Sequence, residues 1–278
     1  MKIPFTKLHG AKNDFLVTMV EGMPTLDLQE AAIAICERYT GVGADGWLLL
    51  DRTGGDDPSG EVFDAAIRLF NSDGSEPEIS GNGTRCAAAL LADSQPEKRD
   101  FRIWTGAGVK HVRLISRNAR KFEFEMNMGN IRVVELNAQV RGRDAVIIDA
   151  GNPQCVFPVD DFDFEWRSVG AAVETDLRFP ARTNVSFVRR IDFHTIDVRF
   201  WERGAGETNS SGTGSTGAAM AAVARGLADS PVTVLTPAGP LQLSLDSVGG
   251  HASTGAFLTG PAEYIADGYF NYGKIVSL

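Results

Sequence analysis

Two short stretches of the chain combine serine and glycine in a pattern that can bind an anion. They are Ser80-Gly81-Asn82-Gly83 and Ser211-Gly212-Thr213-Gly214, and each leads into an alanine-rich run. Glycine lets the backbone turn tightly, and the first N–H groups of a helix have no partner within the helix. Because a helix N-terminus also carries partial positive charge, both stretches predict a helix start that holds an anion beside a serine.

The two stretches lie about half the chain length apart in a sequence of 278 residues, which indicates two homologous halves. A second sign of duplication is Gly151-Asn152-Pro153, which occupies the place in the second half that Gly10-Ala11-Lys12-Asn13 occupies in the first. Glycine-rich turns before alanine-rich helices are also common packing devices, but two copies in register favour a paired site. We therefore expect the two helix starts to form opposite walls of one cleft.

Composition limits the class of protein. The net charge of −9 argues against a nucleic-acid partner or an anionic membrane surface, and no apolar run reaches membrane-spanning length. The three cysteines, Cys36, Cys86 and Cys155, are too few and too widely spaced for a disulfide framework or a zinc site, so a cytoplasmic location and no metal are expected. The partner that remains is a small molecule.

The elements that must position the two stretches alternate between strands and a few helices, an α+β pattern. Asp27 is the expected N-cap of a helix over 28–39, and a short helix is expected over 164–173. Residues 62–70 are expected to form one strand, residues 121–128 and 131–137 two strands, and residues from Pro261 onward a last strand that returns to the first half. The polar turn at Arg117 to Arg120 is the expected domain boundary. The predicted domains are residues 1–116, completed by 264–278, and residues 117–263.

A larger set of motifs resembles the diaminopimelate epimerase family, in the family's order and over nearly the whole chain. The set comprises His9-Gly10 with Asn13-Asp14-Phe15, Gly41-Val42-Gly43-Ala44-Asp45-Gly46, Asn71-Ser72-Asp73-Gly74-Ser75, Gly81-Asn82-Gly83-Thr84-Arg85-Cys86, Gly151-Asn152-Pro153, Asn184-Val185, Glu202-Arg203-Gly204-Ala205-Gly206-Glu207-Thr208 and Gly212-Thr213-Gly214. The resemblance implies two pseudo-symmetric domains, each a curled, mostly antiparallel sheet around a central helix. It also implies a homodimer.

The resemblance further implies an isomerase of lysine biosynthesis that inverts an amino-acid α-carbon without pyridoxal phosphate or any other cofactor. Two cysteines do this in the family, one as thiolate and one as thiol. Helix N-termini stabilise the carbanion that forms, by preorganised electrostatics. The substrate implied is a small amino acid or hydroxy acid.

The family's recognition residues carry over, but its catalytic residues do not. Both cysteine positions are serine here, at Ser80 and Ser211, and the histidine that usually follows Gly-Asn-Pro is Gln154. A serine hydroxyl is far less acidic than a thiol and needs a neighbouring base, for which Glu202 is the candidate near Ser211. The expected substrate-binding residues are Asn13, Asn71, Gly81, Asn82, Asn152, Gln154, Asn184, Arg203, Gly212 and Thr213.

Three functions follow from these residues. The first is an amino-acid epimerase or racemase of this family, with its activity altered or lost. The second is another enzyme on the same scaffold, such as a dehydratase of a hydroxy amino acid. The third is a binding protein that keeps the anion sites without their bases. Deliberate replacement of both cysteines would explain the serines but not Gln154, which favours natural divergence.

Overall fold

The computed structural model describes residues 1–23, 25–246 and 254–273, in two compact units. Unit 1 is Met1–Met126 with Pro261–Leu278, and unit 2 is Asn127–Gly260. The division falls within a long strand, further along the chain than the turn at Arg117 to Arg120, which joins two strands of unit 1. Residues 274–278 of the expected completing segment lie outside the described residues.

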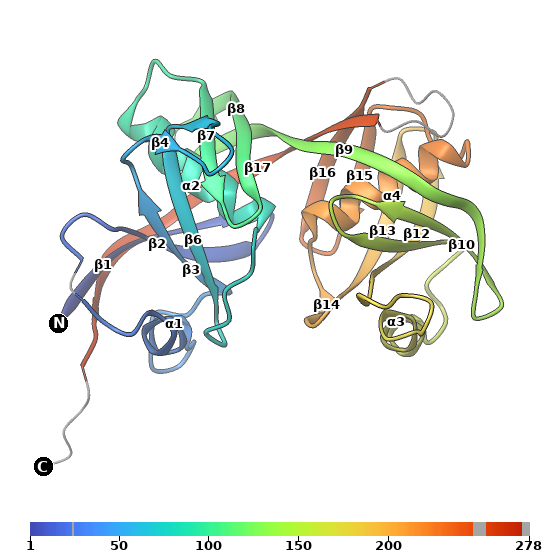
Figure 1. Cartoon of the computed structure of the whole chain (residues 1–278), viewed down its shortest axis with the longest axis horizontal. Helices are drawn as coiled ribbons and strands as arrows, with labels where there is room; N and C mark the ends of the chain where they lie inside the picture. Colours follow the sequence, from blue (N-terminus) through green and yellow to red (C-terminus); the bar gives the residue numbers. More distant parts are fainter. Residues whose placement is uncertain (24, 247–253, 274–278) are drawn as a thin grey trace, which may run out of the picture. The chain divides into compact units, whose positions relative to one another are not determined.

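Unit 1 contains a sheet and two helices (Figure 1). The helices are α1 (Leu28–Cys36) and α2 (Gly81–Ser94). The strands that begin in this unit are β1 (Lys2–Gly10), β2 (Asn13–Met19), β3 (Gly46–Asp51), β4 (Gly55–Asp56), β5 (Val62–Phe63), β6 (Ala65–Asn71), β7 (Asp100–Thr105), β8 (Gly108–Asn118) and β9 (Lys121–Val140). Apart from the small β4–β5 pair, they follow the order β9-β8-β7-β6-β3-β2-β1-β17.

Unit 2 repeats this arrangement. Its helices are α3 (Trp166–Glu174) and α4 (Gly212–Ala224). Its strands are β10 (Arg143–Asp149), β11 (Pro153–Val159), β12 (Asn184–Asp192), β13 (Thr195–Glu202), β14 (Gly206–Thr208), β15 (Val232–Thr236), β16 (Gly239–Leu245) and β17 (Thr254–Asn271), in the order β9-β10-β11-β12-β13-β15-β16-β17 with β14 on β13. The long strands β9 and β17 each contribute pairings to both units.

The two units have the same strand directions, which confirms the duplication expected from sequence. In unit 1, β2 runs parallel to β3, β3 antiparallel to β6, and β6 parallel to β7. In unit 2, β11 runs parallel to β12, β12 antiparallel to β13, and β13 parallel to β15. The other neighbours are antiparallel, so the mostly antiparallel α+β fold is also confirmed.

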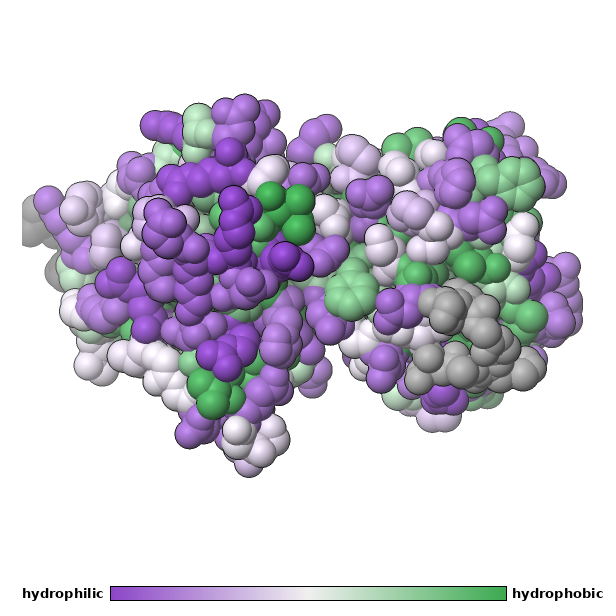
Figure 2. Space-filling model, turned by 90° about the horizontal axis from the view of Figure 1, so that it is seen from above, coloured by the Kyte–Doolittle hydropathy of each residue, from purple (hydrophilic) through white to green (hydrophobic). Residues whose placement is uncertain are grey.

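Each unit surrounds one central helix with its sheet. Helix α2 contacts β1, β2, β3, β6, β7 and β8, and α4 contacts β10, β11, β12, β13, β15 and β16. A helix enclosed on all sides must be apolar all round, which is the pattern of the alanine-rich runs. The second helix of each unit packs on other strands: α1 contacts β3 and β6, and α3 contacts β12, β13 and β14. Hydrophilic side chains cover most of the face of unit 1 at the left of Figure 2.

The predicted helix cap at Asp27 is confirmed. Asp27 caps α1 by accepting hydrogen bonds from the N–H groups of Gln29 and Glu30, and α1 ends at Cys36, earlier than expected. Two strand predictions are wrong. The residues expected to form two strands between 121 and 137 form the single strand β9, which continues through Gly129 at φ 83°.

The other correction lies at Asp64, where the strand expected over 62–70 is interrupted between β5 and β6. The carboxylate of Asp64 accepts a 2.7 Å hydrogen bond from the backbone N–H of Arg102 and lies 2.9 Å from Lys98 Nζ. Burial raises the pKa of this carboxyl group, but the hydrogen bonds from Arg102 and Lys98 outweigh it and lower the pKa to about 2.

We expect Asp64→Asn to destabilise unit 1 by about 2.5 kcal/mol, because a pKa lowered from 3.8 to about 2 corresponds to that energy. The stability that the ionised Asp64 contributes is fully present above the pKa that Asp64 has in the unfolded chain. It is lost as the pH falls through about 2, the pKa in the folded protein. Urea unfolding at pH 7 and pH 2.5 measures it, with the exposed Asp56→Asn as control. Equal stability of the two variants at pH 7 would contradict this role.

Candidate active site

The start of α2 has the geometry that the first serine–glycine stretch predicts. Ser80 is the N-cap, with extended backbone at φ −129° and ψ 119°, and its Oγ accepts a 3.1 Å hydrogen bond from Gly83 N. The Ser80 carbonyl accepts from Thr84 N and Thr84 Oγ1, both at 2.8 Å. The backbone N–H groups of Gly81 and Asn82 therefore precede the first intrahelical bonds and point out of the helix start.

The start of α4 repeats this geometry. Ser211 is the N-cap at φ −138° and ψ 123°, and its Oγ accepts a 3.1 Å hydrogen bond from Gly214 N. The Ser211 carbonyl accepts from Ser215 N at 2.9 Å. Gly212 and Thr213 thus correspond to Gly81 and Asn82, and each unit presents two outward N–H groups beside a serine.

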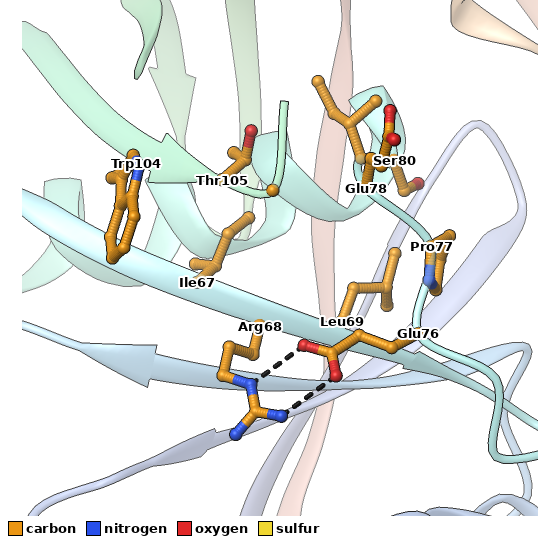
Figure 3. A pocket seen from close by; sticks show the side chains of 11 residues that line it. Ile67, Arg68, Leu69, Glu76, Pro77, Glu78, Ser80, Trp104 and Thr105 are labelled. Atoms are coloured by element: carbon orange, nitrogen blue, oxygen red, sulfur yellow. Dashed lines mark hydrogen bonds and ion pairs between the residues drawn. The ribbon is translucent and has the colours of Figure 1, made fainter. Parts of the chain in front are cut away.

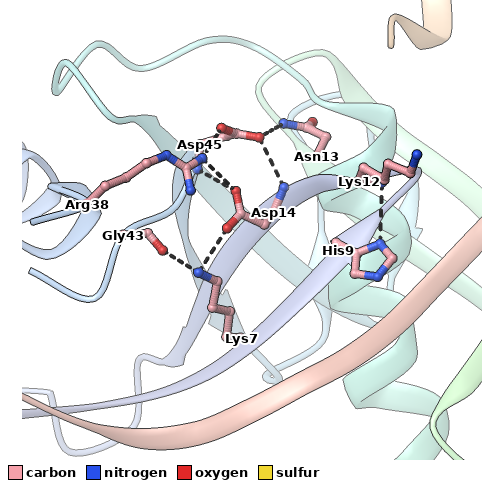
Figure 4. Close-up of polar contacts among 8 residues, drawn as sticks. All are labelled: Lys7, His9, Lys12, Asn13, Asp14, Arg38, Gly43 and Asp45. Carbon is pink, nitrogen blue, oxygen red and sulfur yellow. Dashed lines mark hydrogen bonds and ion pairs between the residues drawn. The ribbon is translucent and has the colours of Figure 1, made fainter. Parts of the chain in front are cut away.

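Asn13 and Asn82 belong to one hydrogen-bonded chain in unit 1. Asn82 Nδ2 donates to Asn13 Oδ1 at 3.2 Å, and Asn13 Nδ2 donates to Asp45 Oδ2 at 2.7 Å. Arg38 bridges Asp45 and Asp14, and Lys7 lies 2.9 Å from Asp14 (Figure 4). Burial raises the pKa of Asp14, but hydrogen bonds from Lys7 and Arg38 outweigh it, so the pKa is lowered. These ion pairs hold the Asn13 amide in one orientation.

Asn71 lies at the same edge of the sheet as Asn13. In the strand register, Asn71 is opposite Gly46, and Gly46 is beside Phe15 of β2. Its Nδ2 donates to Ser75 Oγ at 2.9 Å, and its backbone N–H donates to the Ser75 carbonyl at 2.8 Å. Asn71 therefore closes the turn after β6, and this is the role that the structure gives it.

In unit 2 a corresponding chain of amides leads to the start of α4. Gln154 Nε2 donates to Asn152 Oδ1 at 2.6 Å, and Asn152 Nδ2 lies 3.4 Å from Thr213 Oγ1. Gln154 is fully buried, and its Oε1 has no hydrogen-bond partner among the described residues. The residue at the family's histidine position thus orients Asn152 through a neutral amide.

Asn184 and Arg203 meet through the backbone. Asn184 Oδ1 accepts from Arg203 N at 3.0 Å, and Asn184 Nδ2 donates to the Pro153 carbonyl at 3.2 Å. The Arg203 guanidinium is exposed and donates to the Ala181 carbonyl at 3.0 Å. Asn184 therefore fixes the loop after β13, while the Arg203 head group stays accessible to a ligand.

Glu202 is hydrogen-bonded to the serine at the start of α4. Its Oε2 accepts a 2.8 Å hydrogen bond from Ser211 Oγ, and its Oε1 accepts a 2.6 Å hydrogen bond from Thr208 Oγ1. Burial raises the pKa of Glu202, and these two hydrogen bonds oppose the rise only in part. A carboxyl group whose pKa is raised is a stronger base when it is ionised. In contrast, within its own unit Ser80 Oγ has Gly83 N as its hydrogen-bond partner.

Sequence reasoning missed two members of these clusters. Thr208 ends the motif that begins at Glu202, but nothing in that motif assigns a partner to the Thr208 hydroxyl. Arg85 donates to Asn82 Oδ1, and it had a usable signal: a lone charged residue at the start of an otherwise apolar helix.

A pocket of about 400 Å³ opens beside Ser80 in unit 1. Apolar side chains of Ile67, Leu69 and Trp104 line it, and the bidentate Arg68–Glu76 ion pair lies along it (Figure 3). Its size and lining suit a hydrocarbon part of a small ligand.

The three cysteines are buried and free of disulfides. Burial raises the pKa of each thiol to about 12, so none acts as a base near neutral pH. Within the described ranges, no three His, Cys, Asp or Glu side chains are grouped to hold a metal ion. None of the helices in the described part of the chain has the length and apolar character needed to cross a bilayer.

Solved structures share this fold over nearly the whole chain. A phenazine biosynthesis protein of the PhzF family from Bacillus anthracis superposes with a TM-score of 0.73 at 14% identity, covering 98% of this chain and 100% of that one. A hydroxyproline epimerase from Agrobacterium vitis gives a TM-score of 0.66 at 16% identity, covering 96% and 92%. A methylitaconate-delta-isomerase gives 0.63 at 12% identity, covering 100% and 99%.

Relatives found by sequence have higher identity to this chain than these solved structures have. Diaminopimelate epimerase from Nostoc punctiforme is 35% identical over 288 residues, covering 96% of this chain and 99% of that protein. The enzyme from Moorella thermoacetica is 35% identical over 286 residues, covering 96% and 98%. The family model described as diaminopimelate epimerase matches residues 5–134 and 146–265. With the duplicated fold and both helix starts in place, the chain belongs to the diaminopimelate epimerase family.

Proposed function

We propose that this chain is an isomerase that acts at the α-carbon of a small amino acid or hydroxy acid, with Glu202 and Ser211 as its acid–base pair. The observation that carries the proposal is the 2.8 Å hydrogen bond between Ser211 Oγ and Glu202 Oε2 beside the outward N–H groups of α4. Family membership supports the class of reaction: its members are epimerases, and the relatives from Nostoc and Moorella carry the name of one.

The chemistry follows from the two functional groups. An α-proton is very weakly acidic, so the charge that develops on the substrate carboxylate must be stabilised by fixed donors, which the N–H groups of Gly212 and Thr213 supply. Glu202 then accepts the proton, directly or through the Ser211 hydroxyl, and the electron pair of the C–H bond moves into the carboxylate. Return of a proton to carbon restores Glu202. Serine alone cannot be the base, because its hydroxyl is too weakly acidic to ionise near neutral pH.

One observation favours a second candidate function. A carboxyl group accompanies the serine at α4, whereas within unit 1 the Ser80 hydroxyl has a backbone partner. Inversion at carbon needs a group on each face of the substrate. Loss of water from a β-hydroxy amino acid needs one base and one hydrogen-bond donor to the leaving hydroxyl, a demand that one carboxyl group and a serine meet.

Glu202→Gln should reduce α-proton exchange at least 100-fold, because removal of a general base costs about 10²–10⁴ in rate. The measurement is deuterium incorporation in D₂O, followed by NMR with meso-diaminopimelate, L-lysine and L-threonine, with water loss from L-threonine recorded in the same samples. The matched control is Glu207→Gln, since Glu207 is an exposed acid on the adjacent strand β14 that pairs with Arg167. Unchanged exchange in Glu202→Gln would exclude the proposed base, and ligand binding without exchange or water loss would identify a binding protein.

The pair Ser80→Cys and Ser211→Cys separates the two candidate reactions. If the chain is an epimerase weakened by its serines, restoring both thiols should increase exchange with meso-diaminopimelate, because a thiol at a helix N-terminus ionises far more readily than a hydroxyl. A dehydratase should instead lose activity on its hydroxy acid. An exchange rate unaffected by the double change would count against the epimerase.

Glu202 also makes stability depend on pH. Because its folded pKa is raised above the unfolded value, the folded state binds more protons, and the stability that Glu202 contributes is lost as the pH rises above the unfolded value of about 4.5. We therefore expect Glu202→Gln to have a higher Tm than the wild-type protein at pH 8, with a smaller difference at pH 4. The raised pKa would be contradicted if the Tm difference, Glu202→Gln minus wild type, were smaller at pH 8 than at pH 4.

A further inference from the structure

Arg85 is a buried cation at the start of α2. Its side chain is fully buried, although arginine is almost never fully buried unless it is paired. Burial lowers the pKa of its guanidinium to about 10, so the group stays charged at neutral pH. Transfer of a cation from water into a protein interior costs several kcal/mol unless another charge or hydrogen bonds compensate.

The compensation for this charge is incomplete. Arg85 Nε donates to the Pro261 carbonyl at 3.2 Å, and an Nη atom donates to Asn82 Oδ1. No carboxylate of the described residues forms an ion pair with Arg85. The other terminal nitrogen, Nη1, is buried and has no hydrogen-bond partner there.

This unpartnered nitrogen lies close to Gly81, the first residue of α2. A Cβ atom built on Gly81 would lie 3.9 Å from Arg85 Nη1. The helix start, with its partial positive charge, and the buried guanidinium therefore act on the same small region. No side chain of the described ranges pairs with Arg85 as an anion, so the two positive groups favour an anionic ligand in that region.

We propose that Arg85 is an electrostatic positioning residue that makes the start of α2 a binding site for the carboxylate of the substrate. It acts in two ways: its full charge adds to the helix N-terminus, and its hydrogen bond orients Asn82, whose Nδ2 continues to Asn13. The proposal rests on the proposed function only in taking a carboxylate as the ligand.

Most of the other charged groups around this site are paired with one another. On β2, Asp14 is paired with Lys7 of β1 and with Arg38, and Asp45 is paired with Arg38 (Figure 4). On β6, Arg68 is paired with Glu76. Glu78, in the loop before Ser80, is exposed to solvent, which screens its charge. On β17, burial raises the pKa of Tyr264, which stays neutral.

The pKa of a thiol placed at position 80 measures the electrostatic potential at the start of α2, and the measurement needs neither a ligand nor turnover. In Ser80→Cys we expect a thiol pKa below about 7.5, the range found for cysteines at helix N-termini beside arginine. The pKa is read from the thiolate absorbance at 240 nm and from the pH dependence of alkylation by iodoacetamide. The native cysteines do not interfere, because burial raises the pKa of each to about 12.

Ser211→Cys is the matched control, since its helix start has the same backbone geometry but Glu202 in place of a buried cation. Its thiol pKa should be at least one unit higher than that of Ser80→Cys. Adding Arg85→Met to Ser80→Cys should raise the thiol pKa by at least one unit, and Arg85→Lys should restore the low value. A purely structural Arg85 would lower the Tm in these variants and leave the thiol pKa unmoved.

The result that overturns the proposal is a Ser80→Cys pKa at or above that of Ser211→Cys. Because both of these variants keep Arg85, the comparison tests the proposal even where Arg85→Met fails to fold. Failure of the proposed function is a separate outcome: Glu202→Gln would leave exchange unchanged while the two thiol pKa values still differ as expected.

Discussion

The hydrogen bond from a glycine N–H to a serine hydroxyl fixes the geometry of both helix starts. Ser80 Oγ and Ser211 Oγ each accept at 3.1 Å from the N–H three residues later, so both helix starts have the same cap geometry. Glycine is required at the donor position because the helix lies directly on the strands. A Cβ atom on Gly83 would lie 3.2 Å from Leu48 Cδ1, and one on Gly214 would lie 2.9 Å from Phe200 Cδ1.

The same backbone geometry appears in two different electrostatic environments. At α2 the buried neighbour is the cation Arg85, and at α4 it is the carboxyl group of Glu202. A cation beside outward N–H groups stabilises an anion, whereas a carboxyl group with a raised pKa exchanges protons. The two helix starts thus share one backbone geometry, and under the proposed function Arg85 on α2 and Glu202 on β13 give them different roles.

The sheet supplies the rigid frame for these groups. Asn13 and Asn71 stand at the ends of β2 and β6, which flank β3 in unit 1, and Asn184 and Glu202 stand at the ends of β12 and β13 in unit 2. A parallel pair beside an antiparallel pair brings these strand ends to one edge. Since the strands are held by ladders of hydrogen bonds, the amides of Asn13 and Asn184 keep one orientation, which preorganises the site before a ligand arrives.

The sequence by itself determined the features that depend on neighbouring residues: the two helix starts, the Asp27 cap, the repeat of the halves and the family. Caps, glycine turns and apolar periodicity act over a few residues, so they can be read without a structure. Only the tertiary structure decided what depends on distant contacts. The backbone N–H of Arg102 binds the Asp64 carboxylate, Arg85 Nε donates to the Pro261 carbonyl, and Asn82 Nδ2 donates to Asn13 Oδ1. The sign and strength of a buried charge depend on which groups surround it, and that is set by packing between segments far apart in the sequence.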